Sequence, residues 1–158
     1  MMKGAGLTVG GFYAHFTSKV HLATEALRRA FEKNRGALFV DLDGLSRDKR
    51  YDLIVRRYLS RSHRDMKEET CPVPACLSEI DPGSTELRDA LIDGLEEVVT
   101  RLIPLFEDEP DLTARQRALA TLGLFVGALS LARATRGRDW SDEMLLAARK
   151  LLFRLEGG

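Results

Sequence analysis

The stretch that decides the fold is AGLTVGGFYAHFTSK, residues 5–19. Gly6 suits the tight turn between two helices, and the hydroxyl of Thr8 can cap the helix that follows. Phe12 and Phe16 are four residues apart, so they lie on one face of that helix. This pattern predicts the second half of a helix-turn-helix, placed almost at the start of the chain.

Three polar residues fall off the apolar face of the predicted helix. Tyr13, His15 and Lys19 are positioned where they would reach a phosphate backbone. A helix-turn-helix that reads DNA needs a first helix that crosses the backbone and an apolar scaffold beneath both helices. Only residues 1–5 precede the turn. We therefore expect a DNA-binding head that lacks the first helix and nearly all of the second.

Residues 5–19, together with Leu22, resemble the signature of the TetR/AcrR family of transcriptional repressors. The shared features are a small residue before Gly-Leu-Thr, two small residues, an aromatic pair, His-Phe, Ser-Lys and a leucine-bearing helix. Val20 stands where the family commonly has glutamate. The resemblance implies that residues 8–16 form the recognition helix, with its N-terminal end facing the major groove. The DNA-contacting residues that it implies are Thr8, Val9, Gly10, Gly11, Tyr13, Ala14, His15 and Lys19.

Apolar residues recur at helical spacing along almost the whole chain, and no segment alternates as a strand would. We expect an all-α protein in which a truncated helix-turn-helix head precedes a helical ligand-binding and dimerisation domain, which ends in a dimeric four-helix bundle. The boundary is expected between residues 1–36 and 37–158. Six Lys and Arg against two Glu give residues 1–36 a net charge of +4, which leaves −4 for the remainder. A basic end on an acidic body fits a nucleic-acid contact confined to that end.

Turn and capping signals divide the chain into expected elements. Pro104 should bend or end a long helix that begins after residue 84, and Pro74 could start a short helix after a polar loop. The expected helices run from about 18 to 36, from about 51 to 62, from about 85 to 104, from 113 to 136 and from 141 to 155.

The segment from Ala118 to Ala132 is uncharged and apolar on every side. A helix of this kind must be covered on every side, and a second copy of the chain would supply the cover. Gly123 and Gly127 would allow a close approach of two backbones. The alternative is one monomeric core with a central helix. The TetR/AcrR resemblance also implies dimerisation through the last two long helices. The residues expected at the dimer interface are Leu122, Phe125, Val126, Leu129, Leu145, Ala148 and Leu152.

Aromatic and soft side chains away from these two helices mark a candidate effector cavity. The resemblance implies that the helices bearing them enclose the ligand, although each residue taken singly could equally be ordinary core. A mostly apolar wall with a few polar groups favours a hydrophobic or aromatic effector over a sugar phosphate. The residues expected to bind it are Tyr58, Met66, Cys76, Leu91, Leu95 and Phe106.

The sequence gives catalysis and cofactors no positive support. Cys71 and Cys76, with His63 upstream, match no compact zinc pattern; a packing role is the first interpretation and a redox-sensing thiol pair the second. We expect no cofactor, no metal and no enzymatic activity. Residues 1–30 do not resemble a signal peptide, and the longest uncharged segment is shorter than a bilayer span, so we expect a cytoplasmic protein.

Two functions remain open. The first is a ligand-responsive DNA-binding repressor of the TetR type, whose partners are a double-stranded operator and a small effector. The second is a dimeric helical protein that binds a small molecule and, in this truncated form, does not bind DNA.

Removal of one predicted phosphate contact supplies a test of the head. We expect the 158-residue chain to bind DNA weakly and a version extended upstream to bind a palindrome. In the extended version, Lys19→Ala should weaken binding to all sequences and reduce the slope of log affinity against log salt by about one unit. Fluorescence anisotropy over a salt series measures this slope. An unchanged slope would mean that Lys19 does not contact a phosphate.

Overall fold

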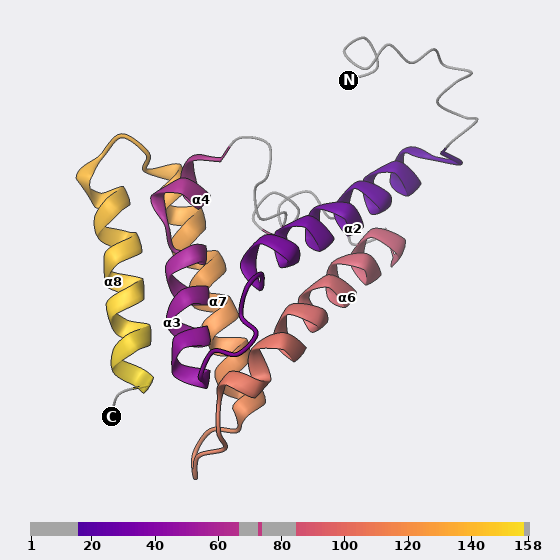
Figure 1. Ribbon diagram of the computed structural model, residues 1–158. Coiled ribbons are helices and arrows are strands. Elements are labelled where there is room, and N and C mark those ends of the chain that lie inside the picture. Colours follow the sequence, from indigo (N-terminus) through magenta and orange to yellow (C-terminus); the bar gives the residue numbers. More distant parts are fainter. Residues whose placement is uncertain (1–15, 67–72, 74–84, 157–158) are drawn as a thin grey trace.

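A computed structural model describes residues 16–66, 73 and 85–156 of the chain, and over these ranges the fold is all-α, as predicted, without a strand. Figure 1 shows two groups of helices: α3, α7 and α8 run alongside one another, while α2 and α6 form a pair that leans away from them. The bounds are α2 Lys19–Leu38, α3 Arg47–Tyr58, α4 Arg61–Asp65, α6 Thr85–Leu102, the 3-10 turn η2 Ile103–Leu105, α7 Ala114–Ala134 and α8 Asp139–Glu156.

Hydroxyl side chains fix where the helices begin. Ser18 accepts a hydrogen bond from the backbone N–H of His21 at 2.9 Å, which caps α2 as the sequence predicts. Thr113 and Gln116 form a reciprocal capping box at α7. At its C-terminal end, α6 gives way to the 3-10 turn that contains Pro104, because proline has no backbone N–H to continue the hydrogen bonds of an α-helix.

The single helix expected over residues 51–62 is in fact two helices. α3 ends at Tyr58, and the side chain of Ser60 accepts the backbone N–H of His63 at 3.0 Å, which starts α4 in a new direction. The last helix also differs from the prediction, because α8 begins at Asp139, two residues before Ser141. Ser141 is buried and donates to the carbonyl oxygen of Ala132 at 2.6 Å, so it ties α8 to α7 instead of capping α8.

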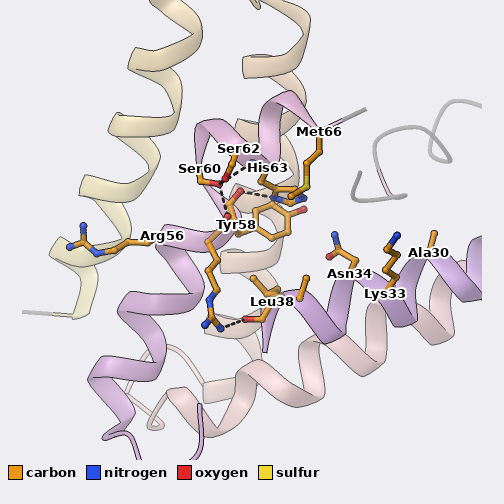
Figure 2. A pocket seen from close by; sticks show the side chains of 12 residues that line it. Ala30, Lys33, Asn34, Leu38, Arg56, Tyr58, Ser60, Ser62, His63 and Met66 are labelled. Carbon is orange, nitrogen blue, oxygen red and sulfur yellow. Dashed lines mark hydrogen bonds between the residues drawn. The ribbon is translucent and has the colours of Figure 1, made fainter. Parts of the chain in front are cut away.

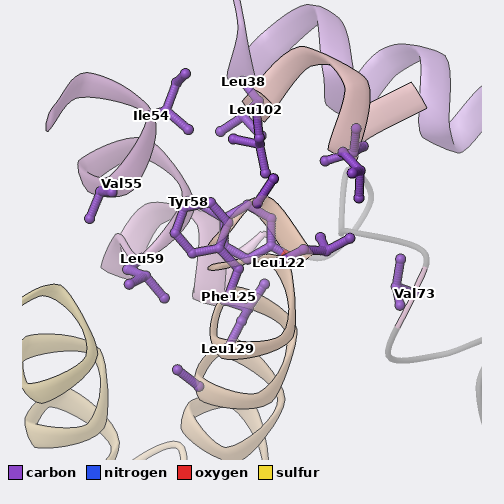
Figure 3. Close-up of a cluster of buried hydrophobic side chains, with 14 of the residues drawn as sticks. Leu38, Ile54, Val55, Tyr58, Leu59, Val73, Leu102, Leu122, Phe125 and Leu129 are labelled. Carbon is purple, nitrogen blue, oxygen red and sulfur yellow. The ribbon is translucent and has the colours of Figure 1, made fainter. Parts of the chain in front are cut away.

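The centre of the core is a stack of two aromatic rings, Tyr58 of α3 and Phe125 of α7. Their centroids are 4.4 Å apart and their planes differ by 10°. Figure 3 shows this pair among buried side chains of α3, α7 and the end of α6. Val55, Leu59 and Leu102 surround it and are fully buried. The stack therefore joins the α3 side of the molecule to the long helix α7.

The residues expected at a dimer interface lie mostly inside the core of this single chain. Six of the seven are buried by the chain itself, and Val126 is partly buried. A second copy could not reach the six buried residues, so the expectation is corrected. They are Leu122, Phe125, Leu129, Leu145, Ala148 and Leu152.

The uncovered side of α7 carries Leu119, Gly123, Gly127 and Leu131, all of which are exposed. Length and hydropathy alone would allow α7, among the described helices, to cross a membrane, but a core helix of a soluble protein passes the same criterion. α7 is therefore apolar both on the side that packs in the core and on the side that this chain leaves exposed.

α2 lies along α6 (Figure 1). The tightest approach of the two helices described is where the ring of Phe31 packs on Gly94. A Cβ placed on Gly94 would lie 2.4 Å from this ring, so only glycine permits the observed approach. Leu27, Phe31 and Leu38 of α2 are buried in the common core. The boundary expected at residue 36 thus falls within α2, a helix that the body holds firmly.

Gly94→Ala should loosen the pairing of α2 with α6. The added methyl group overpacks a buried ring, which costs about 1–3 kcal/mol and outweighs the gain in helix propensity of about 1 kcal/mol. Gly36→Ala is the matched control, because nothing lies within 4 Å of a Cβ at that exposed helical site. Urea unfolding should show Gly94→Ala less stable, and Gly36→Ala no less stable, than the parent. Equal stability of the two variants would contradict the close contact.

Candidate ligand cavity

A cavity of about 450 Å³ lies between α2 and the α3–α4 segment. Figure 2 shows Tyr58, His63 and Met66 grouped on one side of it, with Ala30, Lys33 and Asn34 of α2 on the other. The complete lining is Ala30, Lys33, Asn34, Ala37, Leu38, Arg56, Arg57, Tyr58, Ser60, Ser62, His63 and Met66. The volume is within the range of small-molecule sites in proteins.

The structure brings together only two of the six residues expected to bind a ligand. Tyr58 and Met66 line the cavity, whereas Leu91, Leu95 and Phe106 do not. Leu91 is buried and Leu95 partly buried against the core, while the ring of Phe106 meets that of Tyr51 edge-on at 5.6 Å. These three side chains fill space instead of enclosing it. Cys76, like Cys71, lies outside the described residues.

The imidazole of His63 lines the cavity, and only one of its two nitrogens has a hydrogen-bond partner among the described residues. Its Nδ1 lies 2.8 Å from the carbonyl oxygen of Tyr58. A carbonyl oxygen only accepts hydrogen bonds, so Nδ1 carries the proton, and Nε2 of the neutral ring is an acceptor. The exposed fraction of His63 is 8%, and its Nε2 is buried without a hydrogen-bond partner among the described residues. Burial is the main cause of a pKa below the usual value for histidine, and the nearby charge of Arg133 adds to it.

The cationic side chains of the lining have different surroundings. Arg56 forms an ion pair with Asp52 at 2.8 Å. Arg57 donates to the carbonyl oxygens of Leu38 and Val40 at 3.2 and 2.5 Å. The described lining contains no aspartate or glutamate. The cavity therefore disfavours a positively charged occupant.

Arginines from α7 and from the turn that follows it hold α4 in place. Arg133 donates to the carbonyl oxygen of His63 at 2.9 Å, and Arg136 donates to that of Arg64 at the same distance. These carbonyls lie at the C-terminal end of α4, where a helix leaves them without partners of its own. The wall of the cavity that carries His63 is consequently fixed to the end of α7.

A second set of contacts joins α4 to the first turn of α8. The guanidinium of Arg64 donates to Asp142 at 2.6 Å and to the hydroxyl of Ser141 at 2.8 Å, and Arg61 also pairs with Asp142. Hydrogen bonds from Arg64, and then from Arg61, hold the pKa of Asp142 below its usual value. α4 thus contacts the α7–α8 turn through a charged network as well as through its carbonyls.

The residues expected to contact DNA are described only at their C-terminal end. Lys19 is exposed in the first turn of α2, the same helix that lines the cavity farther along. Thr8, Val9, Gly10, Gly11, Tyr13, Ala14 and His15 lie outside the described residues.

Sequence reasoning missed His63 as a cavity residue, because it assigned residues 63–76 to a loop. The available signal was Ser60, an N-cap residue three positions before His63. That signal indicates a helix start and places the imidazole next to the end of α3. It gives no information on the missing partner of Nε2, which depends on how α2 and α7 pack around it.

The buried imidazole should make stability depend on pH in a defined window. Because the pKa of His63 is lowered in the folded state, the unfolded chain binds a proton more readily, and stability falls as the pH drops below about 6.5. The slope from one proton is at most about 1.4 kcal/mol per pH unit. Urea unfolding between pH 7.5 and 5 should show this slope in the parent and in His21→Gln, and a smaller one in His63→Gln.

The paired carboxylates do not obscure this window. The lowered pKa values of Asp65 and Asp142 lie below the usual 3.8, so their contribution is lost only at more acidic pH. An identical pH slope in His63→Gln and the parent would contradict a neutral buried His63.

Comparisons with known proteins bear on the fold. No family model matches the chain, and no curated protein matches it. Among solved structures, the chain resembles Escherichia coli NemR in its reduced form, with a TM-score of 0.74 and 23% sequence identity. The match covers 97% of this chain and 82% of the NemR chain. At this identity, the likeness shows that the two chains share an all-α fold.

Proposed function

We propose that this protein is a ligand-responsive transcriptional regulator of the TetR/AcrR type, and that the cavity between α2 and the α3–α4 segment is its effector site. The observation that carries the proposal is the position of the cavity on α2. This helix follows directly on the stretch that resembles a recognition helix, and five of its residues line the cavity. An occupant that moves α2 would move the DNA-reading stretch with it.

Two independent features support this assignment. Residues 5–22 carry the motif that resembles the TetR/AcrR signature. The fold is shared with NemR, a TetR-type transcriptional regulator. In the proposed role, the protein works in the cytoplasm, where its partners are a DNA operator and a small effector.

The proposal includes a homodimer, formed through a face of α7 and α8 different from the one the sequence indicated. Gly123 and Gly127 are exposed, and within the part of the chain that the structure describes no neighbouring atom lies within 4 Å of a Cβ at either position. Leu119 and Leu131 flank them, and α8, packed beside α7, exposes leucines of its own. An uncharged stripe of this kind suits a second copy of the same stripe across a two-fold axis. The exposed leucines of α8 are Leu146, Leu151 and Leu155.

Selection of DNA from a random-sequence duplex pool tests the regulatory role. The parent chain, although we expect it to bind DNA weakly, should still enrich an inverted repeat, because a two-fold dimer reads two half-sites, and so should Lys150→Ala, a control at an exposed lysine of α8. The variant Tyr13→Ala/Lys19→Ala should enrich it less. A chain that dimerises and binds small molecules but enriches no sequence would overturn the regulator proposal in favour of a helical ligand-binding protein.

Gly127→Leu should weaken the dimer without disturbing the single chain. The side chain would enter open space in one copy but would separate the two backbones at the proposed contact, which raises the dissociation constant by about tenfold or more. Gly36→Leu is the control, because that glycine is also exposed, helical and free of neighbours within 4 Å. Sedimentation velocity over a concentration series distinguishes the two variants. Dimers of equal strength would place the interface on another surface.

A further inference from the structure

We propose that the natural occupant of the cavity is an uncharged small molecule with an apolar body and a hydroxyl group, and that this hydroxyl donates a hydrogen bond to Nε2 of His63. The inference rests on the proposed effector site and adds the chemical class of the effector and the residue that selects it. It predicts a preference that an unspecialised apolar cavity would not have.

The hydrogen bond of Nδ1 fixes which nitrogen of the imidazole can accept a proton donor. Nδ1 donates a hydrogen bond to the carbonyl oxygen of Tyr58 at 2.8 Å, and the two ring nitrogens point away from each other. Nε2 is therefore an acceptor directed away from α3. A buried acceptor without a partner costs free energy, and a donor supplied by an occupant removes that cost.

The groups around the cavity favour an occupant without a net charge. A carboxylate or phosphate has no proton to donate at neutral pH, and protonation of His63 to receive it is opposed by burial and by Arg133. An ammonium group could donate, but Arg56 and Arg57 line the cavity and no acidic residue is among its described walls. A neutral donor such as a hydroxyl satisfies both conditions.

The walls of the cavity fit the apolar body of the proposed occupant. Ala30, Ala37, Leu38 and the Tyr58 ring give the cavity apolar walls. Met66 is part of the lining and 41% exposed, so its flexible thioether can move to admit an occupant and then cover it. Figure 2 shows its side chain next to the imidazole, on the side of the cavity opposite α2. A small alkylphenol has the required combination of an apolar body and one donor.

The test compares 4-propylphenol with its methyl ether, 4-propylanisole, which keeps the shape but has no proton to donate. Calorimetric titration of the parent chain should give the phenol a dissociation constant about fivefold lower than that of the ether, the effect of one neutral hydrogen bond. The ¹⁵N resonance of Nε2 in His63 should shift on addition of the phenol and much less on addition of the ether. This second reading needs no variant.

Two substitutions separate the two ring nitrogens. His63→Gln keeps an acceptor close to the position of Nε2 and should retain the preference for the phenol. His63→Asn keeps a donor close to the position of Nδ1, which can still reach the Tyr58 carbonyl, but lacks the acceptor and should bind both probes alike. Thermal unfolding confirms that each variant is folded before titration.

The outcomes distinguish this inference from the proposed function. Equal binding of the two probes by the parent, with competition between them for one site, would overturn the role of His63 and leave the effector site in place. Failure of both probes to bind would overturn the inference, whereas the regulatory role would still be decided by the DNA selection. A preference for the phenol that His63→Asn retains would place the acceptor elsewhere in the cavity.

Discussion

The rest of the structure depends on the position of Tyr58 at the end of α3. Its ring stacks on Phe125 of α7, so the end of α3 is fixed against the longest helix of the fold. Its carbonyl oxygen accepts a hydrogen bond from Nδ1–H of His63, whose ring also meets the Tyr58 ring edge-on at 4.8 Å. Tyr58 thus contributes to the core through its ring, contacts the start of α4 through its carbonyl oxygen and forms part of one wall of the cavity. Because the ring is buried and stacked, none of these three features can shift without the others.

The cavity lies between two parts of the fold that are anchored in different ways. α2 is held by apolar contact, above all the ring of Phe31 on Gly94, and by an ion pair between Arg35 and Glu97 of α6 at 2.7 Å. The α3–α4 wall is held by the aromatic stack and by arginines at the α7–α8 turn, among them Arg133 and Arg136. An occupant that pushes these walls apart would meet the charged network of α4 on one side and the packing of α2 on α6 on the other. We propose that α2 is the wall that responds, because it leads to the DNA-reading stretch.

Local sequence signals predicted the helices well, because caps and breakers act through neighbouring residues. Ser18, Thr113 and Pro104 set the helix ends as expected. The position of the cavity could not be read from the sequence, because apolar periodicity shows which side chains face the interior, not whether the interior is filled. Leu91 faces inward and is packed, whereas the position of the cavity depends on where α3 ends. Most residues expected at an interface are core residues of this chain because α7 is apolar on all sides, so its pattern does not separate the core side, with Leu129, from the uncovered side.

The central claim is that occupancy of the cavity controls DNA binding through α2. The most direct measurement is the anisotropy of a labelled duplex carrying the selected repeat, titrated with each of two variants in the presence of 4-propylphenol. Ala37→Trp places a large ring in the cavity, while Gly36→Trp places the same ring on the adjacent exposed position outside its lining. We predict that the phenol changes the DNA affinity of the parent and of Gly36→Trp but not that of Ala37→Trp. An equal response of both variants would contradict the account.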